Sequence, residues 1–278
     1  MIKAYLSITK SAKSYNVPNG LFRPAYELDT GLKKTLATGS KNLDALLSGG
    51  IETGVITQFY GGSYTGKTHL CHLLCVMLPL QYQALYIDTE SSFREDRIKS
   101  IAKARGLDWT KTLKNIQVAK AHGSKEQESC IEAAYPLVKS NSNIKLLIVD
   151  SMTNHYRHEY AKLSNLPARQ HTLNAYMHKL LIVAQTNKVA VVITNQVQVN
   201  PKSKSLNKEQ IIGGNILSHI STYLVHLRRL DSLTVRAELQ KSPNKGFDWH
   251  CLTIEESGFM DLPKPQIISD QKHDQLGL

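Results

Sequence analysis

The stretch Gly61-Gly62-Ser63-Tyr64-Thr65-Gly66-Lys67-Thr68 fits the pattern G-x-x-x-x-G-K-[ST], in which backbone N–H groups and a lysine surround phosphate oxygens. The apolar residues 55–59 before it predict a short buried strand, and residues 69–78 predict a helix that Pro79 ends. This order of strand, loop and helix is the context that a phosphate-binding loop needs. We therefore expect Lys67 to neutralise the β and γ phosphates of a nucleotide and the Thr68 hydroxyl to bind Mg²⁺. The alternative is a glycine-rich turn with an incidental lysine.

Predicted strands and helices alternate outward from this loop. Residues 145–149 are continuously apolar, which is typical of a parallel strand buried on both faces. A polar stretch, 197–212, precedes segments with the alternation of antiparallel strands. The pattern predicts an α/β fold with a largely parallel, doubly wound sheet and a C-terminal antiparallel extension. The predicted strands are 84–87, 116–118, 145–149, 189–194, 223–229, 233–239 and 249–254, and the longer predicted helices are 94–105, 127–140 and 168–187.

Three regions differ in composition. Residues 1–36 are basic and are interrupted by Pro18, Gly20 and Pro24, which predicts an arm or linker. Residues 37–262 carry the alternating pattern and are predicted to form the catalytic core, beginning with a short helix capped by Ser40. Residues 263–278 are polar, which predicts a flexible tail.

The composition limits the class of protein and the kind of partner. The chain has 278 residues and contains neither an apolar run long enough to span a membrane nor a secretory signal. We therefore expect an intracellular protein without membrane contact, in the cytoplasm or nucleoid of an archaeon or the nucleus of a eukaryote. The net charge of +11 favours a polyanionic partner, nucleic acid first. Cys71 and Cys75 are expected to be buried thiols facing the sheet rather than metal ligands.

Polar residues follow three further predicted strands. Residues at the carboxyl ends of neighbouring parallel strands meet at one edge of the sheet, where ligands bind. Asp150, which ends an apolar run, is expected to hold a water of the Mg²⁺ shell. Glu90 is expected to orient and deprotonate the attacking water, and Gln196 to sense the γ phosphate. The alternatives are a helix-capping carboxylate for Glu90 and a strand-end amide that binds backbone for Gln196.

Several blocks of this sequence stand in the order and spacing of one family. The blocks are 38–44, 49–54, the phosphate-binding loop, 86–94, 146–151, 168–170, 191–197 and 213–216. In these blocks the chain resembles the archaeal RadA and eukaryotic strand-exchange recombinases, which are relatives of RecA. The resemblance covers about residues 20–260. It implies a RecA-type P-loop NTPase fold, DNA-dependent ATP hydrolysis with Mg²⁺, binding of single- and double-stranded DNA, and self-association into a filament or ring.

The resemblance also implies roles for individual residues. Glu90 is similar to the family's catalytic glutamate, Gln196 to its γ-phosphate sensor and Arg97 to the arginine that stacks on adenine. Residues 157–169 resemble the first DNA-binding loop and residues 197–212 the second. His219 resembles the histidine that faces the neighbour's nucleotide. The implied residues are Lys67, Glu90 and Gln196 for catalysis; Gly61, Gly62, Ser63, Tyr64, Thr65, Gly66, Lys67, Thr68, His69 and Arg97 for the nucleotide; Thr68 and Asp150 for the metal; Arg157, Lys162, Arg169, Lys202, Lys204 and Lys208 for DNA; and Phe22, Ala25, His219 and Lys241 for the interface between protomers.

The interface residues include one motif and one departure from the family. Phe22 and Ala25 fit the Phe-x-x-Ala motif by which one protomer docks into the next. Lys241 stands where the family has an aspartate of its nucleotide cap, and we expect it to place a cation near the neighbour's γ phosphate.

Other departures weaken parts of the family pattern. About 20 residues precede Phe22, so the family's N-terminal helical DNA-binding domain is missing on this reading. Ser63 lacks the aromatic that would contact the neighbouring histidine, and Leu163 replaces an arginine of the first loop. The second loop is shorter and has no aromatic residue for base stacking. Gly246 replaces a proline that would lie over the neighbour's adenine.

The sequence leaves three functions open. The first is a DNA-dependent ATPase of the RadA type, acting in homologous recombination and repair. The second is an accessory paralogue similar to RadB, with weak ATP hydrolysis, that serves a principal recombinase. The third is a ring-forming signalling ATPase with a RecA fold. DNA binding separates the third function from the others, and the rate of DNA-stimulated ATP hydrolysis separates the first two.

Overall fold

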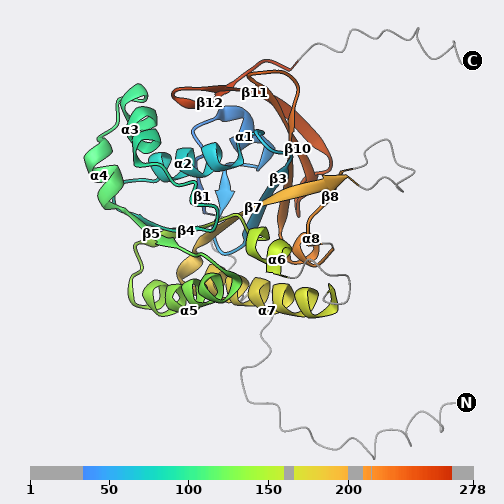
Figure 1. Cartoon of the computed structure of the whole chain (residues 1–278). Helices are drawn as coiled ribbons and strands as arrows, with labels where there is room; N and C mark the ends of the chain where they lie inside the picture. Colours follow the sequence, from blue (N-terminus) through green and yellow to red (C-terminus); the bar gives the residue numbers. More distant parts are fainter. Residues whose placement is uncertain (1–33, 160–165, 200–208, 214, 265–278) are drawn as a thin grey trace, which may run out of the picture. The chain divides into compact units, whose positions relative to one another are not determined.

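The computed structural model describes residues 34–159, 166–199, 209–213 and 215–264 (Figure 1). The first two strands, β1 (Thr35–Leu36) and β2 (Ile51–Glu52), form a small antiparallel pair. Helix α1 (Lys41–Leu46) lies between them in the sequence, and its expected cap is confirmed because the Leu43 N–H donates to Ser40 Oγ at 3.1 Å.

Ten of the described strands form one sheet, in which β12-β11-β10-β9-β3-β7-β6-β4-β5 are successive neighbours and β8 pairs with β7. The strands from β9 to β5 in this order are parallel, and β10, β11 and β12 extend the sheet antiparallel. The α/β prediction is therefore confirmed. The strands are β3 (Ile56–Gly61), β4 (Gln83–Asp88), β5 (Ile116–Lys120), β6 (Ile144–Asp150), β7 (Ala190–Val199), β8 (Glu209–Ile211), β9 (Tyr223–Arg229), β10 (Thr234–Lys241), β11 (Asp248–Glu255) and β12 (Gly258–Asp261).

Helices cover both faces of the sheet (Figure 1). Alternate residues of a strand point to opposite faces, so Tyr86 in β4 joins one apolar cluster while Leu85 and Ile87 join the other. Cys71 and Cys75 are buried in the first cluster, as expected. Together with α1, helices α2 (Lys67–Met77), α3 (Glu95–Ala104) and α4 (Trp109–Lys114) pack on the first face; α5 (Ser124–Ser140), α6 (Asn154–Glu159), α7 (Leu166–Gln185) and α8 (Asn215–Ile220) pack on the second, where the short η4 (Thr186–Lys188) follows α7.

The structure corrects the prediction for the two polar loops. Strand β7 does not end before Gln196 but continues to Val199, because its last residues leave the main sheet and pair antiparallel with β8, with Val197 opposite Ile211. The segment 157–169 is not a continuous loop, because Arg157 lies in α6 and Arg169 in α7. The strand at 223–229 also differs from its prediction, because β9 is parallel to β3 on one side and antiparallel to β10 on the other. Among the described helices, none combines the length and apolar character that crossing a membrane requires.

Candidate active site

Four polar strand ends lie side by side at the carboxyl edge of the parallel sheet. Strands β3, β7, β6 and β4 are successive neighbours. Gly61 is opposite Gln196 across the β3–β7 pair, and Asp88 is opposite Asp150 across the β4–β6 pair. The residues expected to act on a nucleotide are therefore brought to one edge.

The loop between β3 and α2 has a shape that depends on glycine. Gly66, which precedes α2, has a φ of +85°, and a Cβ there would lie 2.7 Å from Phe259 Cζ. A Cβ on Gly61 would lie 2.2 Å from the carbonyl oxygen of Leu227. Tyr64 also has a positive φ, of 62°, and its side chain is 83% exposed at the tip of the loop. The close approach of Phe259 and of the Leu227 carbonyl therefore requires glycine at positions 66 and 61.

Lys67 places its ammonium inside this loop. Its Nζ donates to the carbonyl oxygens of Gly61 at 2.9 Å and of Gly62 at 2.6 Å. Burial lowers the pKa of Lys67, and the charges of Asp150 and Glu90 partly offset that effect. The first turn of α2 has no acidic residue that would repel an anion. An ammonium, a glycine-dependent loop and a helix N-terminus together are suited to a polyphosphate.

Asp150 is 2% exposed and accepts hydrogen bonds from three hydroxyl groups, of which that of Ser92, at 3.4 Å, is the longest. Tyr86 Oη donates to Asp150 Oδ2 at 2.8 Å, and Thr194 Oγ1 donates to Asp150 Oδ1 at 2.5 Å. Burial, followed by the charge of Asp150, raises the pKa of Tyr86 well above its usual value, so Tyr86 remains a donor. The carboxylate at the end of β6 is thus an oriented oxygen donor of the kind that Mg²⁺ and its bound water prefer. Thr68, the second residue of α2, is half-buried.

Glu90 and Gln196 lie in direct contact. Glu90 Oε1 accepts from Ser151 Oγ at 2.6 Å and from Gln196 Nε2 at 3.2 Å. Glu90 is exposed, so its carboxylate can reach water at the edge of the sheet. The contact joins a candidate general base in the loop after β4 to a polar side chain of β7.

Asp88, which sequence reasoning did not single out as a site residue, fixes the loop that carries Glu90. Its carboxylate is 1% exposed and accepts from the main-chain N–H groups of Glu90 at 3.2 Å, Ser92 at 3.0 Å and Phe93 at 3.0 Å. The sequence signal was an aspartate at the end of a predicted strand. Such an aspartate readily accepts hydrogen bonds from the backbone N–H groups that follow it.

Arg97 and His69 lie together on the other side of the phosphate-binding loop. The guanidinium of Arg97 donates from Nε to His69 Nδ1 at 3.2 Å and from Nη2 to the carbonyl oxygen of Glu255 at 2.6 Å. Burial, followed by the charge of Arg97, lowers the pKa of His69 to about 4, so the imidazole is neutral at pH 7 and can accept this hydrogen bond.

The cations expected to bind DNA are only partly described. Arg157 is exposed in α6, whereas Arg169 is half-buried in the first turns of α7, where its Nε is buried without a hydrogen-bond partner. Contacts to the start of α5 hold α6, because His155 Nε2 lies 2.7 Å from the Ala121 carbonyl oxygen and Glu159 accepts from the Ser124 N–H at 2.7 Å. Lys162, Lys202, Lys204 and Lys208 lie outside the described residues.

Two of the expected interface residues are described. His219 is exposed in the last turn of α8. Lys241 directs its ammonium into its own chain, where Nζ donates to the carbonyl oxygens of Ser218 at 2.9 Å, His219 at 2.8 Å and Ser221 at 2.7 Å. Phe22 and Ala25 lie outside the described residues.

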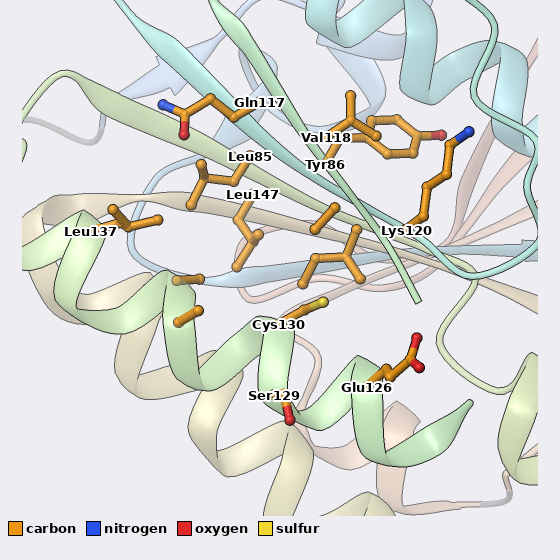
Figure 2. Close-up of a pocket in the computed structure, with 14 residues that line it drawn as sticks. Leu85, Tyr86, Gln117, Val118, Lys120, Glu126, Ser129, Cys130, Leu137 and Leu147 are labelled. Atoms are coloured by element: carbon orange, nitrogen blue, oxygen red, sulfur yellow. The ribbon is translucent and has the colours of Figure 1, made fainter. Parts of the chain in front are cut away.

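A separate cavity of about 410 Å³ lies between strands β4 and β5 and helix α5 (Figure 2). Its apolar lining comes from both layers and includes Leu85, Leu147 and Leu137. Lys120 and Glu126 lie at the same end of the cavity (Figure 2). Because β5 is the last of the described strands on this side of the sheet, the cavity borders a strand that pairs on one side only.

Comparison with known proteins agrees with this geometry. The family model described as Rad51 matches residues 33–262. A DNA repair and recombination protein RadA from Aeropyrum pernix is 42% identical over 218 residues, which cover 75% of this chain and 68% of that protein. The family-model match spans all four strand ends of the candidate site, from the phosphate-binding loop to Gln196.

Proposed function

Because the chain belongs to the Rad51 family, we propose that it is an ATP-dependent, single-stranded-DNA-binding recombinase of the RadA type, acting inside the cell in homologous recombination and DNA repair. One observation carries the proposal. The Glu90 carboxylate accepts a hydrogen bond from Gln196 beside a phosphate-binding loop, so the candidate base is in direct contact with the candidate phosphate sensor.

The hydrolytic roles follow from the contacts at the sheet edge. Lys67 exchanges its loop carbonyls for phosphate oxygens and neutralises them. Glu90 orients the attacking water and accepts its proton, while the hydrogen bond from Ser151 holds the carboxylate. Thr68 and Asp150 are the residues that would hold Mg²⁺, which supplies charge neutralisation at the transferring phosphate when bound. Gln196 leaves Glu90 when a γ phosphate is present, and so signals the nucleotide state to the rest of β7.

Arg97 and His69 are proposed to form the base end of the nucleotide site. The guanidinium plane of Arg97 is suited to stacking on adenine. The neutral imidazole of His69 and the Glu255 carbonyl hold that plane in place. The residues of the phosphate-binding loop, Gly61 to Thr68, complete the site.

The DNA site is proposed to combine two groups of cations. Arg157 and Arg169 flank the first segment, which includes Lys162, and the β7–β8 pair flanks the second, which carries the lysines at 202, 204 and 208. Such cations neutralise phosphates and release counterions, so DNA affinity is expected to fall steeply with salt. A duplex is the proposed second DNA partner, as recombination requires.

Self-association is proposed to use the Phe-x-x-Ala motif and the cavity beside the edge strand. Phe22 and Ala25 of one protomer would enter the cavity between β5 and α5 of the next, where the apolar lining suits a phenyl ring and the free edge of β5 suits an extended segment. His219, in the last turn of α8, and Lys241, at the end of β10, are proposed to face the neighbouring protomer's nucleotide.

The two alternative functions have less support. A relative that is 42% identical to this chain is a RadA protein, which does not favour an accessory paralogue. A signalling ATPase would not need cations in both segments that resemble DNA-binding loops.

ATP hydrolysis measured with and without single-stranded DNA tests the proposal. We expect DNA to stimulate turnover, and Lys67→Ala to lower kcat by about a hundredfold or more. Lys139→Ala, a change at an exposed residue of α5, is the matched control and should leave turnover unchanged. Slow turnover that is indifferent to DNA would contradict the proposal and support the accessory paralogue.

A further inference from the structure

A buried histidine outside the active site lies between two carboxylates. His226 in β9 is 1% exposed. Its Nε2 lies 3.0 Å from Glu209 Oε2, and its Nδ1 lies 3.5 Å from Glu238 Oε2. Neither nitrogen has the alignment of a hydrogen bond, so both are polar contacts defined by distance. The buried imidazole therefore contacts β8 and β10, the strands before and after β9 in the sequence.

The first connection leads to the phosphate-binding loop. Tyr60 is the residue before Gly61 and is opposite His226 in the β3–β9 pair. The two rings stack with centroids 4.6 Å apart and an angle of 3° between their planes. Burial, followed by the charges of Glu238 and Glu209, raises the pKa of Tyr60, so its hydroxyl stays neutral. His226 therefore packs flat against the end of β3, directly before the loop proposed to bind phosphate.

The second connection leads to the proposed DNA segment. Glu209 is the first residue of β8, a strand of three residues that pairs with the end of β7. Its side chain is 36% exposed. A three-residue pair outside the main sheet has few main-chain hydrogen bonds, so a side-chain contact at its first residue contributes a large share of its attachment.

Glu238 has other partners besides His226. Burial alone would raise its pKa, but contacts with His226 and Arg236, and the charge of Arg228, lower it to about 2. Arg236 Nε donates to Glu238 Oε1 at 2.7 Å, and Arg228 Nε lies 3.9 Å from the same oxygen. Glu238 therefore has two arginine contacts besides His226, whereas Glu209 is the contact of His226 on the β8 side.

We propose that His226 is a positioning residue that links the DNA segment to ATP hydrolysis: it attaches the β7–β8 pair to the strand leading into the phosphate-binding loop, through Glu209 on one side and Tyr60 on the other. The inference rests on the proposed function, because it assumes that residues 200–208 bind DNA. When bound DNA fixes the β7–β8 pair, the contact between Glu209 and His226 restricts the position of β3 through Tyr60. Gln196 is restricted as well, because it lies in the same strand as Val197–Val199.

The test uses the full chain and two conservative variants. His226→Phe keeps a flat ring against Tyr60 but removes both ring nitrogens, and Glu209→Gln keeps the size of the side chain but removes its charge. Glu132→Gln is the control, because Glu132 forms an exposed ion pair with Lys179 in another part of the fold. Hydrogen exchange of the β8 amides without DNA measures the attachment. ATP turnover over a range of single-stranded DNA concentrations measures the coupling.

We expect both variants to speed exchange in β8, and to raise the DNA concentration for half-maximal stimulation, by about fivefold or more. Turnover without DNA should not change. The double variant should behave like either single variant, because each substitution removes the same contact between His226 and Glu209.

Unchanged exchange in either single variant would overturn the attachment, and additive effects in the double variant would overturn the pairing of His226 with Glu209. Faster exchange with normal DNA stimulation would overturn the coupling. If the unaltered protein is not stimulated by DNA, the proposed function fails, while the exchange measurement still judges the attachment.

Discussion

Glu90 is the residue on which ATP hydrolysis is expected to depend most. Its loop is fixed by Asp88 and its carboxylate by Ser151, so a change of the carboxylate to an amide should leave the fold intact. Glu90→Gln is expected to lower kcat by about a hundredfold or more, because the amide cannot accept the proton of water. The affinity for ATP, measured by equilibrium binding, should change little. Loss of ATP binding together with turnover would show that Glu90 acts on structure instead.

His69 and His72 make stability depend on pH. Burial, followed by the charge of Arg97, lowers the pKa of each to about 4, below the usual 6.5 of histidine. Between these two values the unfolded chain binds more protons than the folded chain, so the free energy of unfolding should fall as the pH drops from about 6.5 to about 4. Glu238, with a pKa of about 2, adds its own loss only below about pH 4.5.

Urea unfolding at about pH 7 and about pH 5 checks this dependence. The free energy of unfolding is expected to fall by about 1 kcal/mol or more for each histidine. His72→Phe should reduce the fall, because the substituted ring can pack against Tyr86 and Phe93 and cannot be protonated. An equally steep fall in this variant would contradict the assignment to His72.

The ammonium of Lys241, from β10, caps the C-terminal end of helix α8. Three carbonyl oxygens from Ser218 to Ser221 accept from this one group, at the negative end of the helix dipole. Lys241→Met is expected to speed hydrogen exchange in α8 and to lower the free energy of unfolding by about 1 kcal/mol, because these carbonyls lose a charged partner. Lys139→Met in α5 is the control. Unchanged exchange would mean that water replaces the ammonium without loss.

The elements of the parallel sheet could be predicted because their sequences carry strong local signals. Continuous apolar runs marked β4, β6 and most of β7, and the glycine-rich loop marked the start of α2. The end of β7 could not be predicted, because residues 197–199 pair with β8 rather than with the main sheet, and such pairing depends on a distant segment. The short helices α4 and α6 have too few residues for a clear helical period.

The same reasoning applies to the candidate site. The phosphate-binding loop, Glu90, Asp150 and Gln196 could be identified by type and position, because a parallel sheet brings strand ends together. The contacts of Tyr86 and Thr194 with Asp150 could not, because each depends on register between neighbouring strands. His226 gave no signal in the sequence, since its partners lie on β8 and β10.

Self-association of the whole protein is expected to depend on the cavity beside β5. Ala134 lines this cavity, so Ala134→Met should fill part of it and weaken docking. Phe22→Ala should weaken the same contact from the other side. Both variants are expected to sediment as smaller species than the unaltered protein. Phe247→Ala, at an aromatic that is 66% exposed elsewhere, is the matched control. Normal assembly of both variants would show that protomers associate through another surface.

The most direct measurement of recombinase function is the pairing of single-stranded DNA with a homologous duplex. The reaction should be run with the full chain, Mg²⁺ and either ATP or no nucleotide, with Lys67→Ala beside the unaltered protein. We predict joint molecules that require ATP, homology and an intact Lys67. ATP turnover stimulated by DNA without any joint molecules would contradict the central claim, and would assign the chain an accessory role in repair.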